Sequence, residues 1–401
     1  MTIAMGEKIF HHQLVYNDYA KLSRNFFNLG SLLEKIFKTT FLSKSGTQEG
    51  ENTYMGNTGN KEIDVQGIFS SLPNVPTALF QSQCVVWKDE ILICGGRPHN
   101  HHCYSYHTTK RKYKKICEYP HTIRIFGHVV VKCESDNNEL TLLSFGGVDV
   151  SKYTLLMSYQ SVWEKSRRKE KKKNEWRVVH HDTSFGTRKS NLTGASALIG
   201  GKNKDLLFVT YFPNKIDVID MKTYHYVCGT GSNRLPIKSP YSLQNHCFVP
   251  LTSSNQTVVN HFLLIHKNLS LLIKYNEEDK KFCYESLPTC PSLATCDCYG
   301  FISFNDQIFF FGGYDASAMT EIDYIFIYAM KDRAWTQSKH SLPIPTRGCC
   351  PVLIGDGRFL HLVGGLAHHR TQAMHLATTV RAFDQVCFFF FFLSVIHLVI
   401  I

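Results

Sequence analysis

The feature that most constrains how this chain of 401 residues folds is a short apolar run that ends in a pair of glycines. It recurs at residues 90–96, 140–147, 307–313 and 358–365. The first glycines of successive copies are 51, 166 and 52 residues apart, and 166 is about three periods of 55. We therefore expect two degenerate copies inside the long interval. Apolar runs without the glycine pair stand at the expected places, residues 205–211 and 261–267.

A second marker supports the same spacing. In four units an apolar or aromatic residue precedes an aromatic residue with six positions between them. The pairs are Tyr106 and Tyr113, Ile219 and Tyr226, Tyr275 and Phe282, and Tyr328 and Trp335. In the second unit an insertion interrupts the pair and displaces Trp176. A third marker is a Leu-Pro or Tyr-Pro dipeptide at the end of most units. The three markers recur with the same spacing and together indicate six units of about 50 residues.

Each unit contains four short runs rich in Val, Ile, Leu, Phe and Tyr, separated by Gly, Asn, Asp or Pro. This pattern predicts a four-stranded antiparallel meander. Such a sheet has two apolar faces that it cannot bury by itself, so each unit must stack on its neighbours. The glycine pair follows the second strand, where we expect the chain to turn tightly and to pack against the next unit.

On these residues the sequence resembles the kelch-repeat β-propellers, over about 320 residues from 64 to 383. The resemblance implies an all-β fold, a six-bladed propeller of four-stranded antiparallel blades. It implies little about biochemistry, because one fold serves many functions. The structural kelch positions are Gly95, Gly96, Tyr106, Tyr113, Gly146, Gly147, Trp176, Tyr275, Gly312, Gly313, Tyr328, Trp335, Gly364 and Gly365.

The two ends of the repeat predict how the ring closes. The last unit supplies three strand-like runs, whereas residues 65–73 resemble the fourth strand of a unit whose other three strands are missing. We expect this N-terminal strand to complete the sixth blade, because joining the first and last blades removes open sheet edges.

The sequence outside the repeat falls into two segments. Residues 1–62 predict an amphipathic helix, from apolar residues at three- and four-residue steps, and then a flexible linker. The propeller is expected at residues 63–385. Residues 386–401 are nearly all apolar, but a helix of 16 residues spans about 24 Å and the hydrocarbon core of a bilayer about 30 Å. This tail is either a short membrane anchor or an artefact of translated non-coding sequence.

The charge balance raises the question of a polyanionic partner, since 44 basic and 33 acidic residues give a net charge of +11. The nine-residue run Lys165–Lys173 has seven basic residues and one acidic residue, so it supplies +6. It lies between the third and fourth predicted strands of the second blade. There it is either a solvated loop or a patch for nuclear import or nucleic acid. No aromatic residue is interleaved to stack on bases, so a nucleic-acid partner is not favoured.

Cysteine content bears on the compartment. Fourteen cysteines in 401 residues fall short of the roughly 8–10% of a disulfide scaffold, and no secretory signal is visible. We therefore expect a reducing, cytoplasmic location. The alternatives are membrane association through Val386–Ile401 and nuclear import through Lys165–Lys173.

Two groups of potential metal ligands lack the paired spacing of a metal site. Cys296 and Cys298 alternate as on one face of a strand, which predicts two small buried side chains. Recognisable catalytic motifs are also missing from the sequence. We therefore expect no catalytic, metal-binding or cofactor-binding residues and a protein that is not an enzyme. The two groups are His99, His101, His102, Cys103 and His107, and Cys290, Cys296 and Cys298.

Function is expected on one face of the propeller. In a four-stranded meander, the loops after the second strands and the loops between blades share one face, and loop tips on a rigid scaffold commonly bind partners. We expect a non-catalytic scaffold that binds a partner protein there. The alternatives are a propeller enzyme of the oxidase or isomerase type and a membrane-tethered propeller. The candidate partner-binding residues are Arg97, His99, Arg124, Asp149, Asp315, Arg347 and His368.

Overall fold

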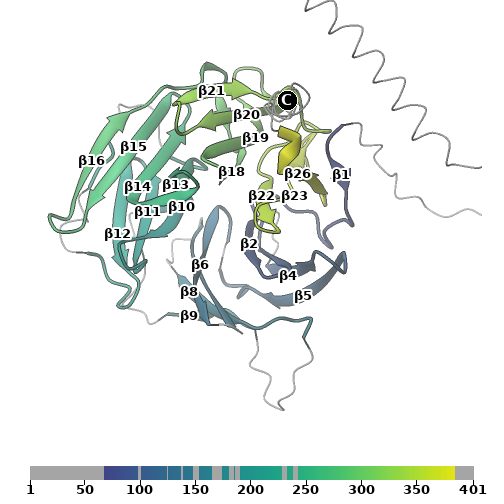
Figure 1. The fold of residues 1–401 in the computed structure, drawn as a ribbon. Coiled ribbons are helices and arrows are strands. Elements are labelled where there is room, and N and C mark those ends of the chain that lie inside the picture. Colours follow the sequence, from purple (N-terminus) through teal and green to yellow (C-terminus); the bar gives the residue numbers. More distant parts are fainter. Residues whose placement is uncertain are drawn as a thin grey trace, which may run out of the picture. The chain divides into compact units, whose positions relative to one another are not determined.

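The structure is a computed structural model in which six antiparallel sheets surround a central axis (Figure 1). The prediction of an all-β, six-bladed propeller is confirmed. The described residues are 67–97, 101–123, 125–136, 139–147, 153–164, 174–179, 185, 190–227, 233–237 and 243–383. The expected helix and linker at 1–62, the tail at 386–401 and the run Lys165–Lys173 lie outside them. No helix in the described ranges is long and apolar enough to cross a membrane.

The strands follow one another in chain order within the first three blades. Blade 1 contains β2 (Gln83–Trp87), β3 (Glu90–Cys94), β4 (His102–His107) and β5 (Lys112–Glu118). Blade 2 contains β6 (His128–Asp136), β7 (Glu139–Gly146), β8 (Thr154–Tyr159) and β9 (Arg177–Val178). Blade 3 contains β10 (Asn191–Gly200), β11 (Leu206–Phe212) and β12 (Lys215–Asp220).

The remaining blades add short elements to the same plan. Blade 4 contains β13 (Cys247–Ser253), β14 (Gln256–His266), β15 (Leu269–Asn276) and β16 (Lys281–Ser286). The 3₁₀ helix η2 (Pro291–Leu293) leads to blade 5, which contains β17 (Cys296–Asp297), β18 (Gly300–Phe304), β19 (Gln307–Asp315), β20 (Thr320–Ala329) and β21 (Ala334–Gln337). Blade 6 contains β22 (Cys350–Ile354), β23 (Phe359–Val363), β26 (His375–Thr379) and β1 (Ser70–Ser71). A hairpin of β24 (Leu366–Ala367) and β25 (Arg370–Thr371) precedes β26, and η3 (Val380–Phe383) follows it.

The pairs spaced by six residues are cross-strand partners between the third and fourth strands. Tyr328 lies opposite Trp335, with ring centroids 4.9 Å apart, and Tyr275 lies opposite Phe282 at 4.8 Å. Their spacing reflects a hairpin in which the two rings face each other across the ladder, an arrangement that stabilises antiparallel pairs. Trp176, just before β9 of blade 2, stacks on Tyr119, which follows β5 of blade 1, with ring centroids 4.7 Å apart.

The expectation of four strands in every blade is wrong for blade 3. Among the described residues, β12 is followed only by isolated bridges, Ile219 with Tyr226 and Lys215 with Arg234. Residues 228–232, which stand between these two bridges in the chain, lie outside the described residues.

The ring closes as the sequence predicts. Ser70 and Ser71 of β1 pair with Ala377 and Leu376 of β26, and the Leu72 amide donates a hydrogen bond to the His375 carbonyl at 2.9 Å. An N-terminal strand therefore covers what would otherwise be the open edge of blade 6 (Figure 1).

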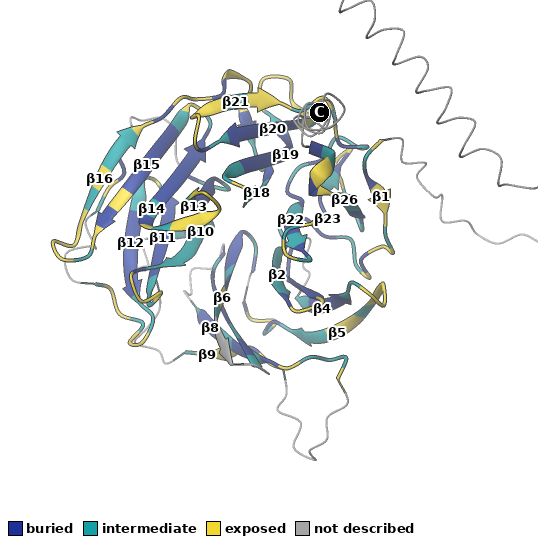
Figure 2. Ribbon diagram, viewed as in Figure 1, coloured by how far each residue is buried: buried dark blue, intermediate teal, exposed yellow. Residues whose placement is uncertain are grey.

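The core is divided among the seams between blades. The buried apolar residues form six clusters, each made by one blade and the next. Burial is greatest in the middle strands, as in β3, whose five residues are all buried, and least in outer strands such as β5 and β21 (Figure 2). Each sheet thus buries its two faces against its neighbours, which keeps the loops of one face in fixed relative positions.

Candidate functional site

The first strands of the six blades line the central channel. Their N-terminal ends surround a cavity of about 240 Å³. Each first strand starts after a loop between blades, so this end of the channel belongs to the face on which the sequence places partner binding. The elements that meet there are β2, β6, β10, β13, β18 and β22.

Six residues at this mouth share one backbone conformation. Each stands one or two residues before its first strand or, in blade 3, inside it, and each has a left-handed φ between 51° and 67°. Backbone hydrogen bonds of 2.6 to 2.9 Å join several of them from blade to blade. The donor and acceptor pairs are Gln81 to Gly348, Gly194 to Gly127, Asn245 to Gly194, and Gly348 to Cys298.

Three positions of this ring are glycines because the blades approach closely. A Cβ on Gly194 would lie 2.8 Å from the Asn245 amide nitrogen, and one on Gly348 would lie 2.6 Å from the Phe80 ring. A side chain at either position would collide with the next blade in addition to straining the backbone.

The other three positions carry side chains that meet over the channel axis. The Gln81 Nε2 donates to Asn245 Oδ1 at 3.1 Å, and both amide nitrogens lie near Cys298 Sγ, at 3.5 and 3.4 Å. We call Gln81, Asn245 and Cys298 the polar plug. Burial raises the pKa of the Cys298 thiol to about 11 although Arg347 and Arg97 act in the opposite direction, so the thiol is protonated at neutral pH.

Two of the predicted residues, Arg97 and Arg347, flank this plug. The Arg347 guanidinium lies 4.4 Å from the Tyr314 ring centroid and has its Nε 3.5 Å from Glu321 Oε1. Arg97 lies on the rings of Phe80 and Phe126, and no carboxylate among the described residues is within 4 Å of it. Partial burial lowers the pKa of Arg97, and the positive charge of Arg347 acts in the same direction. The mouth is therefore cationic, with one guanidinium uncompensated by the residues described.

Two of the remaining predicted residues, Asp315 and His368, are described by the structure, and neither lines the cavity around the plug. Asp315 ends β19 and accepts hydrogen bonds from the Ser317 amide and hydroxyl at 2.8 and 2.6 Å, contacts that lower its carboxyl pKa to about 2. It therefore stabilises its own turn. His368 is exposed at the tip of the β24–β25 hairpin, whose first residue pairs with Arg347. His99, Arg124 and Asp149 lie outside the described residues.

One expectation about the cysteines is wrong. Cys296 is buried in the short strand β17, but Cys298 has a φ of 54°, so the two residues do not alternate along one extended strand. The turn directs Cys298 toward the axis and into the plug. Within the described ranges, no three His, Cys, Asp or Glu side chains are placed to share a metal ion.

Sequence reasoning misses the plug because its residues share no chemistry. The signal is positional: Gln81, Asn245 and Cys298 stand where the other units have Gly127, Gly194 and Gly348, just before an apolar first strand. Aligning the six units at the first strand, and not only at the glycine pairs, exposes a position where glycine alternates with Gln, Asn and Cys.

Comparisons with known proteins agree with this architecture. No protein-family profile and no curated protein matches the sequence. Solved structures do match, and one of them is YjhT, a kelch-repeat protein. It superposes with a TM-score of 0.53 over 77% of this chain and 96% of that chain, at 12% sequence identity. At that identity the similarity establishes the six-bladed propeller fold alone.

Proposed function

We propose that this chain is a kelch-type propeller that acts as a non-catalytic scaffold and binds a partner protein at the mouth of the channel. The observation that carries the proposal is the pair of guanidinium groups, Arg97 and Arg347, beside a polar plug. An uncompensated, partly buried arginine is a favourable site for an acceptor group of a partner, because charge-assisted hydrogen bonds are among the stronger polar contacts. Arginine is also enriched among the residues that dominate binding energy at protein interfaces.

The kelch assignment rests on the glycine pairs after four second strands and on the aromatic pairs across the outer hairpins. The similarity to YjhT supports it at the level of fold. The scaffold assignment is supported by rigidity, since the ring of hydrogen bonds around the mouth fixes the plug and so reduces the ordering cost of binding.

The test is affinity purification of the full chain, followed by identification and quantification of stoichiometric partners. The double variant Arg97→Ala/Arg347→Ala is expected to lose the partner at least tenfold, since truncating an interface hot spot costs about 2 kcal/mol or more. The matched control is Lys222→Ala/Arg333→Ala, which removes two cations from turns on the opposite face. If the wild type, the arginine variant and the control melt at the same temperature, a loss of partner binding comes from the changed surface and not from unfolding.

Two outcomes contradict the proposal. If the arginine variant retains its partner as well as the control does, the mouth is not the binding surface. If the wild-type protein purifies without a partner and converts a small molecule, and this conversion is lost in the arginine variant, the mouth is the active site of a propeller enzyme.

A further inference from the structure

Two short basic runs in the sequence together carry a charge equal to the net charge of the protein. Lys165–Lys173 contributes +6, and the run Lys110–Lys115, with five basic residues in six, contributes +5. Their sum equals the net charge of +11, so the other 386 residues are neutral in total. The second run is described by the structure, where it forms the turn between β4 and β5 and the first half of β5.

A tryptophan from blade 2 lies among these cations of blade 1. The Lys114 and Lys110 ammonium groups lie 4.5 and 5.2 Å from the Trp163 ring centroid, and the indole Nε1 donates to Ser105 Oγ at 2.8 Å. The Lys114 ammonium also donates to the Val162 carbonyl at 3.0 Å. In the sequence, the run Lys165–Lys173 begins two residues after Trp163.

A buried carboxylate holds this arrangement in place. Glu90, which is 4% exposed, accepts hydrogen bonds from Ser105 Oγ at 2.5 Å, Tyr159 OH at 2.6 Å and Ser161 Oγ at 2.6 Å. These bonds tie the segment before Trp163 to blade 1. The position of the indole between the lysines is therefore part of the packed structure.

The cations of this surface are exposed and mostly uncompensated. Lys110, Arg111, Lys112 and Lys114 are all exposed. Within the residues described, none of the four has a carboxylate within 4 Å, whereas Lys115 is paired with Glu118. We call these four residues, together with Trp163, the lysine surface.

The chain leaves the described propeller on the face that carries this surface. The third strand of every blade ends on one face, so the β4–β5 turn and the end of β26 both lie there. After β26, the Val380 amide donates a hydrogen bond to the carbonyl of Arg358, which stands in a turn of the same face. Phe383 is the last residue of the chain that the structure describes. The sequence that follows includes 16 nearly uniformly apolar residues, 386–401.

We propose that the lysine surface binds the surface of an anionic lipid bilayer. Lysine ammonium groups on a convex outer strand and its turn can approach a plane of lipid headgroups together, and each strengthens binding by about fivefold. Tryptophan is enriched at the membrane–water interface. Stable membrane association commonly needs two signals, and this chain has a basic patch and, in its sequence, an apolar segment at residues 386–401. The inference does not depend on the proposed function, which concerns the opposite face.

Nucleic acid fits these observations less well. Proteins that bind single strands stack bases on aromatic rings. Trp163 already has two ammonium groups over its ring and His107 against it in an edge-to-face contact at 5.2 Å. A nucleic-acid partner would also leave the apolar sequence of residues 386–401 without a role.

The test is co-sedimentation of the full chain with vesicles of phosphatidylcholine, with and without phosphatidylserine. The wild-type protein is expected to bind the anionic vesicles more tightly than the neutral ones, and the neutral vesicles report what the apolar tail contributes. The variant Lys110→Glu/Lys112→Glu/Lys114→Glu is expected to bind anionic vesicles about a hundredfold more weakly. Raising the salt from about 0.1 M to about 1 M, which shortens the Debye length from about 10 Å to about 3 Å, is expected to weaken wild-type binding to the level of neutral vesicles.

The matched control is Lys222→Glu/Lys274→Glu/Arg333→Glu, which changes the net charge equally but replaces cations that are paired with Asp205 or Glu285. Lys222 and Arg333 stand in turns of the same face but outside blades 1 and 2, so this control separates the lysine surface from the charge of the whole face. It is expected to retain more of the binding than Lys110→Glu/Lys112→Glu/Lys114→Glu. The milder variant Lys110→Gln/Lys114→Gln, for which an intermediate loss of binding is expected, keeps the test valid if the triple variant does not fold.

Equal binding of the wild-type and triple-variant proteins, or equal binding to both kinds of vesicle, overturns the proposal. Binding of duplex DNA that depends on the same lysines, without vesicle binding, reassigns the surface to nucleic acid.

Discussion

At the scale of single residues, the glycine pairs are explained by contacts with the next blade. The first glycine of the pair in blade 5, Gly312, has a φ of 58°, and a Cβ there would lie 2.1 Å from the Thr346 carbonyl oxygen. Thr346 belongs to the loop that leads into blade 6, and its carbonyl accepts a hydrogen bond from the Gly313 amide at 2.9 Å. The pair lets the loop of one blade lie directly on the backbone of another.

Replacing Gly312 by Ala is therefore expected to destabilise the fold by about 2–4 kcal/mol, from backbone strain and overpacking together. Urea unfolding followed by circular dichroism measures the effect. Gly67→Ala is the control, because Gly67 also has a positive φ, of 129°, but no atom within 4 Å of a Cβ. Equal stability of Gly312→Ala and the control would show that the contact with Thr346 is unimportant.

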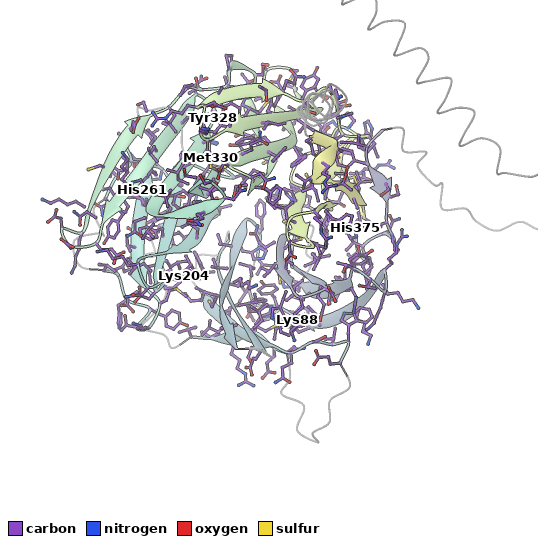
Figure 3. All side chains as sticks on the ribbon, in the orientation of Figure 1. Lys88, Lys204, His261, Tyr328, Met330 and His375 are labelled. Carbon is purple, nitrogen blue, oxygen red and sulfur yellow. The ribbon has the colours of Figure 1, made fainter. Side chains whose placement is uncertain are left out.

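Two buried histidines and the half-buried Tyr113 form a hydrogen-bond chain where blades 6 and 1 meet. Tyr113 OH lies 2.5 Å from His375 Nδ1, and His375 Nε2 lies 2.9 Å from His361 Nδ1. His375, the middle residue of the chain, is labelled in Figure 3. A neutral imidazole has one donor and one acceptor nitrogen, so two neutral histidines can complete this chain in either direction, from Tyr113 to His361 or the reverse. Burial lowers the pKa of His361 to about 4, and burial together with His361 lowers that of His375 to about 3.

These shifts predict a loss of stability in acid. An unfolded histidine binds a proton near pH 6.5, so between about pH 6.5 and about pH 4 the unfolded chain holds more protons and the free energy of unfolding falls as the pH falls. His361→Gln, whose amide can donate to or accept from His375, is expected to flatten this dependence by roughly 2 kcal/mol at about pH 4.5. Urea unfolding at neutral and acidic pH compares the two proteins. Parallel pH profiles would contradict the assignment.

At the scale of elements, closure depends on a very short strand. β1 has two residues, both exposed, yet the flanking Phe69 is 4% exposed and packs on Phe383 at 6.3 Å. The strand is held by its ladder bonds to β26 and by this apolar anchor. Its physical role is to cover the edge of blade 6, which would otherwise offer unpaired backbone groups to another chain.

Deleting residues 65–72 is expected to expose that edge and to make the protein aggregate. The soluble fraction after expression and the elution profile in size-exclusion chromatography measure the effect. Deleting residues 1–62, which precede the strand, is the comparison and is expected to leave the protein monodisperse. A soluble, monodisperse protein without residues 65–72 would argue against closure by β1.

At the scale of the whole molecule, the proposals divide two functions between two faces. The arginines at the channel mouth lie on the face of the loops between blades, and the lysine surface lies on the face of the turns that follow third strands. The two faces lie on opposite sides of the apolar core, which consists of six clusters between neighbouring blades. No ion pair among the described residues joins Arg97 or Arg347 to the lysine surface.

The faces are therefore expected to act independently. Arg97→Ala/Arg347→Ala should leave vesicle binding unchanged within about twofold, and Lys110→Glu/Lys112→Glu/Lys114→Glu should leave partner binding unchanged within the same limit, because distant sites without shared contacts are additive. Each variant is measured in both assays. A loss of both activities in either variant, with unchanged melting, would show that the two surfaces are coupled.

The sequence by itself determined the number of blades, the order of their strands and the closure by an N-terminal strand. These properties depend on local patterns that recur: apolar runs, glycine pairs and the spacing of Tyr328 and Trp335 across one hairpin. The same local logic failed in blade 3, where the expected fourth strand reduces to isolated bridges.

The tertiary structure alone decided which side chains meet. Gln81, Asn245 and Cys298 come from three blades and touch only because the ring brings all the first strands to one axis. Lys110 and Lys114 of blade 1 likewise contact Trp163 of blade 2, which is about 50 residues away in the chain. Such contacts depend on the angle at which sheets pack around a closed ring, and no periodicity within a single unit encodes them.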